Sequence, residues 1–164
     1  MALSATGSDP DGPPPSLSWD VLLVHKGHSH TLGTFNGPQA SFETVTDHDA
    51  DSHYVITLSA TDNVGYTVQL PPIQIVPETT TLKIRSNVSK VKVSYAGRTV
   101  KTPKKLTASI GFKASLAAPR RLVRGGKTFR FKRWSQGGRR VQGFQVPAAP
   151  TTVRAIYRKA GAGK

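Results

Sequence analysis

The 164-residue sequence contains no cysteine, a single methionine and no long apolar run. Without cysteine there is no disulfide framework, so the redox compartment cannot be inferred from one. No stretch reaches about 18 consecutive apolar residues, so no membrane-spanning helix is expected. The first twelve residues lack a basic region and a long apolar core, and we expect no secretory signal in them. We expect the chain to be a piece of a longer protein, with Met1 added by cloning.

Acidic residues are absent from the second half of the chain. All nine lie between Asp9 and Glu78, a range in which Lys26 is the single basic residue. The remaining 86 residues hold 22 lysines and arginines, so the formal charge changes from −8 to +22 near position 78. Such a break indicates a module boundary. We therefore predict modules at 1–77 and 80–158 and a flexible tail at 159–164.

Apolar residues do not keep helical spacing for three turns anywhere in the chain, and turn formers recur at short intervals. This pattern predicts an all-β chain of two tandem small antiparallel β-sandwich modules. The predicted strands are 17–24, 31–35, 40–45, 54–60, 66–70 and 73–76 in the first module, and 82–85, 91–95, 98–101, 106–116, 127–134, 141–146 and 152–157 in the second.

Basic residues alternate with apolar ones in the second module. Leu82 and Ile84, for example, alternate with Lys83 and Arg85, and the same pattern recurs within 127–134 and 152–157. Successive side chains of a strand point to opposite faces of the sheet. If the apolar residues form the core, the basic ones therefore line the outer faces.

Three histidines follow the apolar run that starts at Trp19. In a strand, His25 points to the same side as Trp19, and His28 and His30 share one face of the segment that follows. Neutral imidazole is a common ligand of zinc and copper, and His48 could complete the set from another loop. The alternative is that these histidines only bond to the backbone at the rim of a sandwich.

Calcium is the less favoured ion. Asp47, Asp49 and Asp51 have the spacing that opens a calcium-binding loop. However, Ser52 stands where the EF-hand needs glycine, and Leu58 stands where it needs glutamate. Turn formation by aspartate is the plainer interpretation of this loop.

Carbohydrate binding would require exposed aromatic rings. Trp19 alternates with apolar neighbours, which predicts a core position. Trp134 breaks the alternation of Phe129 and Phe131, which places it either on the surface or at a β-bulge. The candidates for stacking on sugar rings are Trp134, Tyr66 and Tyr95.

The basic second module predicts a large positive potential that attracts polyanions. The alternative is a face that only solubilises the module, or one that docks against the acidic first module. No helix-turn-helix, zinc-finger or RNA-recognition motif occurs, so nucleic acid would bind only non-specifically. No nucleophile or phosphate-loop motif occurs either, and the chain is not expected to be an enzyme. The candidate polyanion-binding residues are Lys104, Lys105, Arg120, Arg121, Arg130, Lys132, Arg133, Arg139, Arg140 and Arg154.

The first module resembles the PKD-like (polycystic kidney disease type) β-sandwich through LSATGSDPDG at 3–12 and YVITLSATDNVGYT at 54–67. The strand pattern W-x-V-x-x-x-H-x-x-H-x-H, at 19–30, is similar to the PKD-related module attached to secreted bacterial sugar dehydrogenases of the glucose/sorbosone type. The resemblance covers roughly residues 3 to 76. It implies an immunoglobulin-like sandwich with an accessory role, because no cofactor-binding portion of such an enzyme is present.

The second module is similar to small β-rich repeats of bacterial surface proteins, through FKRWSQGG at 131–138 and AIY at 155–157. Gln136 replaces the acid usual in that repeat. Together the resemblances imply a non-catalytic, extracellular accessory segment of a secreted protein that binds carbohydrate or an anionic cell-envelope polymer and serves a catalytic domain of the same longer chain. The alternatives are a structural spacer without a ligand and a non-specific binder of polyanions such as nucleic acid.

Overall fold

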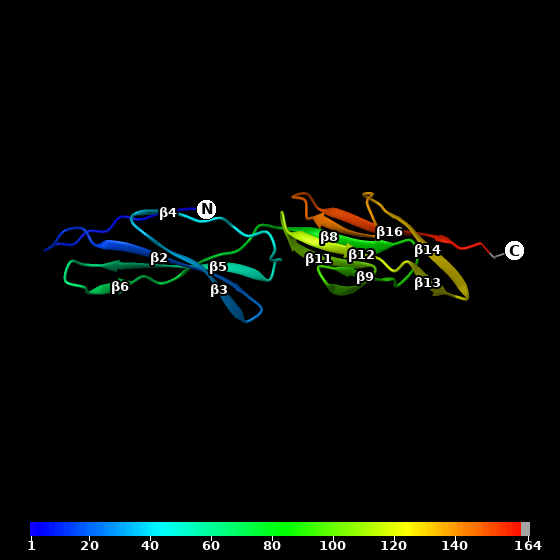
Figure 1. Cartoon of the computed structure of the whole chain (residues 1–164), viewed down its shortest axis with the longest axis horizontal. Helices are drawn as coiled ribbons and strands as arrows, with labels where there is room; N and C mark the ends of the chain where they lie inside the picture. Colours follow the sequence, from blue (N-terminus) through cyan, green and yellow to red (C-terminus); the bar gives the residue numbers. More distant parts are fainter. Residues whose placement is uncertain (162–164) are drawn as a thin grey trace. The chain divides into compact units, whose positions relative to one another are not determined.

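The protein is built from β-strands, as a computed structural model of residues 1–161 shows (Figure 1). The predicted all-β class is confirmed. The chain divides into two compact units. The first consists of Met1–Val45 and Ala50–Pro77, and the second consists of Thr46–Asp49 and the residues from Glu78 onward. Within residues 1–161 no helix has the length and apolar character needed to cross a membrane.

The first unit has one large antiparallel sheet in the order β3-β2-β5-β6, and β7 also pairs with β5. β1 and β4 form a separate two-stranded sheet. Alternate residues of β2 are buried, including Trp19, whose Nε1 donates a hydrogen bond of 3.0 Å to the Gly37 carbonyl. The strands are β1 (Ala2–Ser4), β2 (Ser16–His25), β3 (His28–Asn36), β4 (Gln39–Ser41), β5 (Ser52–Thr61), β6 (Thr67–Gln69) and β7 (Ile73–Ile75).

The second unit has two sheets, in the orders β11-β8-β16-β14-β13 and β10-β9-β12-β15. β8 and β16 run parallel, which corrects the predicted antiparallel arrangement of this module, whereas the other pairs are antiparallel. Side chains from both sheets form one buried cluster, which is the arrangement of a β-sandwich. The strands are β8 (Thr79–Ser86), β9 (Lys92–Tyr95), β10 (Arg98–Lys101), β11 (Lys104–Ser109), β12 (Lys113–Ala117), β13 (Arg121–Arg124), β14 (Lys127–Trp134), β15 (Val141–Gln145) and β16 (Thr151–Lys159).

The alternation of apolar and basic residues has the expected effect in this unit. Leu82 and Ile84 of β8 are fully buried, whereas Lys83 and Arg85 are exposed. Every second side chain of the strand therefore contributes to the core, and the basic ones between them face solvent.

The predicted elements differ from the structure at several places. The segment 106–116 is not one strand, because Gly111 turns the chain with a φ of +81° and separates β11 from β12, which belong to different sheets. β1 and β13 were not among the predicted strands. The predicted tail begins too early, because Lys159 is the last residue of β16; positions 162–164 lie outside the described residues.

Candidate functional site

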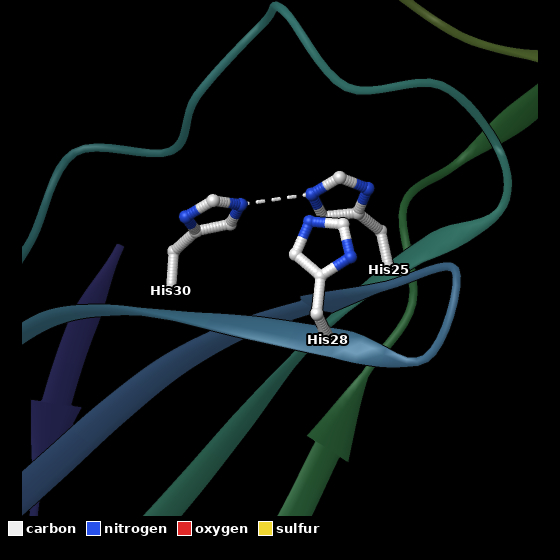
Figure 2. Close-up of side chains that lie close together, drawn as sticks. All are labelled: His25, His28 and His30. Carbon is white, nitrogen blue, oxygen red and sulfur yellow. Dashed lines mark hydrogen bonds between the residues drawn. The ribbon is translucent and has the colours of Figure 1, made fainter.

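The three histidines of the first unit lie around the tight turn between β2 and β3 (Figure 2). Lys26 and Gly27 form this turn with φ values of +47° and +81°. Two consecutive residues with positive φ are what a two-residue hairpin requires. His25 therefore pairs directly with His28, and Leu23 pairs with His30. Because paired residues point to the same face, the hairpin places all three imidazole rings on one side of the sheet.

The rings are close enough to share one ion. One donor atom from each histidine can be chosen so that all three lie within 4.8 Å of one another. The Nε2 atoms of His25 and His30 are 2.9 Å apart, and the ring centroids of His25 and His28 are 4.1 Å apart. Zinc bound to nitrogen at about 2.0–2.1 Å in tetrahedral geometry holds its donors roughly 3.3 Å apart. Small ring rotations would therefore be enough to form a site with three imidazole ligands.

The contact between His25 and His30 also constrains their protonation. Two Nε2 atoms at 2.9 Å form a hydrogen bond only if one carries the proton and the other offers its lone pair. At least one ring is therefore neutral in this arrangement. A metal ion would replace the shared proton and accept both lone pairs.

The predicted fourth ligand, His48, lies on another segment of the chain. His48 lies in Thr46–Asp49, which is part of the second unit, and its Nδ1 is 2.7 Å from Oδ1 of Asp47. Among the described residues, the histidines shown to lie close enough to share an ion are His25, His28 and His30, and a role for His48 as fourth ligand stays a prediction. His53 pairs with Val24 and so points to the other face of the sheet from His25.

The three aspartates of the proposed calcium loop each contact a different kind of group. Oδ1 of Asp49 accepts a hydrogen bond of 3.0 Å from the Ser109 amide. Asp47 contacts His48, and Asp51 lies 4.0 Å from the Lys26 ammonium. Among the described residues, the group of three metal-ligand side chains found close together is that of the histidines His25, His28 and His30.

Two of the three aromatic candidates for sugar binding lie in the core, which corrects the prediction. Trp134 is 0 % exposed, and its Nε1 donates to the Arg140 carbonyl at 3.2 Å. A β-bulge between Phe131 and Arg133 adds one residue to β14 and returns the indole to the buried face. A β-bulge was one of the two predicted explanations for the broken alternation at Trp134, and it is confirmed. The other, a surface position of the indole, was wrong.

Tyr95 is also buried, at the end of β9 in the core of the second unit. Burial raises the pKa of its hydroxyl well above the ordinary value, and the negative charge of Asp49 adds to the effect. Tyr66 is the remaining candidate and is 70 % exposed. It borders a cavity of about 360 Å³ whose other walls include Leu17, Leu58 and Leu70.

All ten candidate polyanion-binding residues are exposed. One of them is tied to the fold: the Arg140 guanidinium donates a hydrogen bond of 2.7 Å to the Ala118 carbonyl. Burial raises the pKa of the Tyr157 hydroxyl to about 12, and the positive charge of Arg140 opposes this shift. The candidate set left out other exposed cations of this unit, among them Lys83, Arg85 and Arg158, although their alternation with apolar neighbours was a sufficient signal.

The positive charges of the second unit are hardly compensated. Its acidic residues are Asp47, Asp49 and Glu78. Leaving Arg98 aside, no lysine or arginine of this unit within residues 1–161 has a carboxylate within ion-pair distance. The described chain thus offers two kinds of chemistry, a cluster of imidazole donors and an excess of exposed cations. Comparison of the chain with protein-family models, curated proteins and solved structures found no match.

Proposed function

We propose that the chain is a non-catalytic accessory module, acting outside the cell, whose second unit binds an anionic polymer. The observation that carries this proposal is the exposure of every described lysine and arginine of that unit against only three carboxylates. Charges of one sign over such a surface create a potential of several kT, which concentrates polyanions near the protein. The accessory role and the extracellular location are supported by the resemblances of both modules.

The buried aromatic rings favour this function over binding of a neutral sugar. Stacking on a sugar requires an exposed ring face, and Trp134 and Tyr95 have none. A spacer that needed only solubility would be served by charges of mixed sign, because like charges at short range destabilise a compact fold. An excess of cations without nearby anions is instead suited to a ligand that supplies the anions.

Affinity electrophoresis of the full chain provides the test. We expect retardation in gels that contain heparin or alginate, and unchanged mobility in gels that contain dextran or another neutral polysaccharide. Unchanged mobility in every gel would leave only the spacer role. Retardation by neutral polysaccharide alone would point to sugar binding, for which Tyr66 is the exposed aromatic candidate.

A second function is favoured by the histidine group of the first unit. We infer that His25, His28 and His30 bind one zinc or copper ion. Imidazole suits both metals, and copper(II) is the tighter binder in the general order of divalent ions. His28 and His30 are exposed, so an ion from solution would reach the donors directly.

Titration of the metal-free chain with zinc or copper, followed by elemental analysis after gel filtration, tests this inference. We expect one ion per chain. Replacement of both His28 and His30 by alanine should weaken metal binding by more than about 100-fold, because loss of a residue that only supports a ligand already weakens it roughly 10- to 100-fold. His53→Ala is the matched control, because this histidine points to the other face and should leave binding unchanged. Equal binding by the double variant and the wild type would contradict the site.

A further inference from the structure

Basic residues line the outer face of the five-stranded sheet of the second unit. In β16, Val153 and Ala155 are fully buried, so Arg154 between them faces outward. β8 has the same arrangement, with Lys83 and Arg85 outward. The face that opposes the core of this unit is therefore basic on adjacent strands.

The register of the strands aligns these side chains in rows. Arg158 of β16 pairs with Arg130 of β14, which in turn pairs with Arg121 of β13. Neighbouring strands are about 4.7–4.9 Å apart, so three guanidinium groups originate side by side across three strands. Two further rows place Lys105 opposite Lys83 and Arg154 opposite Arg85.

Like charges directly opposite each other destabilise a sheet. The three rows contain seven cations, and none of them forms an ion pair with a carboxylate in the part of the chain that the structure describes. No acidic residue follows Glu78 in the sequence, so these strands contain no neutralising partner of their own. The arrangement weakens the fold unless something else supplies negative charge. We call this surface, formed by Lys83, Arg85, Lys105, Arg121, Arg130, Arg154 and Arg158, the arginine face.

The chemistry of the arginine face narrows the class of polyanion. All aromatic side chains of these strands belong to the core cluster or pack against it, namely Phe129, Phe131, Trp134 and Tyr157. The face therefore has no ring on which a nucleobase or a sugar could stack, although such stacking is the usual means of holding single-stranded nucleic acid. The ligand must be recognised through its anionic groups alone.

The row of arginines favours phosphate among these groups. A guanidinium fork binds a carboxylate or a phosphate through two parallel hydrogen bonds. An internal phosphate of a linear polymer has two non-bridging oxygens, as a carboxylate has, but it lies in the polymer backbone itself, so successive phosphates can meet the guanidinium groups of neighbouring strands. We propose that the arginine face binds a linear phosphate polymer, such as polyphosphate or a phosphodiester-linked envelope polymer. This inference rests on the proposed function, because it names the polymer and the surface that binds it.

Two triple variants of the full chain test the assignment. The first carries Arg121→Gln, Arg130→Gln and Arg158→Gln. The control carries Lys92→Gln, Lys101→Gln and Lys113→Gln, which removes the same charge from exposed positions of the four-stranded sheet, including the directly paired Lys92 and Lys101. The ligand used is long-chain inorganic polyphosphate, with heparin, alginate and oligo(dT) as comparison polymers.

We expect the first variant to bind polyphosphate about 100-fold more weakly at 0.1 M salt, because each of three lost contacts releases about 0.7 counterion. The control should stay within about 3-fold of the wild type, since its charges act only at long range. Thermal melts of both variants check folding, and removal of the like-charged row should leave stability equal or higher.

The outcomes separate this inference from the proposed function. A wild-type chain that binds none of the four polymers overturns both. If the wild type binds and both variants weaken binding equally, the ligand is still anionic, but the arginine face is not its binding site. Tighter binding of oligo(dT), heparin or alginate than of polyphosphate overturns the assignment to a phosphate polymer.

Discussion

Replacement of Trp134 by alanine will lower the melting temperature of the second unit by at least about 12 °C. The indole is fully buried, and its centroid lies 5.7 Å from that of Phe131. Loss of a buried tryptophan typically costs about 3–5 kcal/mol, and for a domain of this size each kcal/mol corresponds to about 4–8 °C. The variant also leaves the carbonyl of Arg140 without its indole donor.

Differential scanning calorimetry of the full chain measures this effect. Trp134→Phe keeps most of the apolar volume and should lose less, whereas Val123→Ala, at a residue 53 % exposed, should change the transition by little. Trp19 remains as a fluorescent reporter of the first unit, whose core contains it. A cost below about 1 kcal/mol for Trp134→Ala would mean that the indole is not packed as described.

The affinity of the chain for polyphosphate will fall about 10³-fold between 50 and 200 mM salt. Seven cations form the arginine face, and contacts of this kind to a single-stranded polyanion release about 0.7 counterion each. A logarithmic plot of affinity against salt concentration should therefore have a slope near about −5. Fluorescence anisotropy with labelled polyphosphate at several salt concentrations gives this slope.

The Arg121, Arg130 and Arg158 triple variant provides the matched comparison. Its slope should be shallower by about 2, because three of the seven contacts are missing. A wild-type slope smaller in magnitude than about 1 would contradict polymer binding by this face, since it would mean that at most one or two cations meet the ligand.

The elements of the fold were predictable where periodicity is local. Buried and less buried side chains alternate along most of β2 and the first half of β5, and Trp19 lies in the core as its alternation predicts. Trp134 shows the limit of this reasoning, because a single extra residue in β14 reverses the side to which every later side chain points. The sequence pattern indicated that the alternation was broken, but not which way the indole would turn.

The candidate sites also differ in how far apart in the sequence their residues lie. The histidine group depends on one strand, one turn and the first residues of the next strand, so nearby spacing was sufficient to predict that three histidines lie close together. The arginine face depends on the parallel pairing of β8 with β16, which joins segments about 70 residues apart. Neither the order of strands nor their register follows from alternation alone, so the rows of like charge could not be predicted.

The segment Thr46–Asp49 has a consequence for the separability of the two units. The carbonyl of Thr46 accepts a hydrogen bond of 2.9 Å from the Lys113 amide, and Asp49 accepts one from the Ser109 amide. Covalent connections between the units therefore occur at three points of the backbone, not at one. A gene fragment that starts at Glu78 would encode a second unit without two of its hydrogen-bond acceptors, the Thr46 carbonyl and the Asp49 carboxylate. Division of the chain at any single peptide bond therefore leaves at least one unit incomplete.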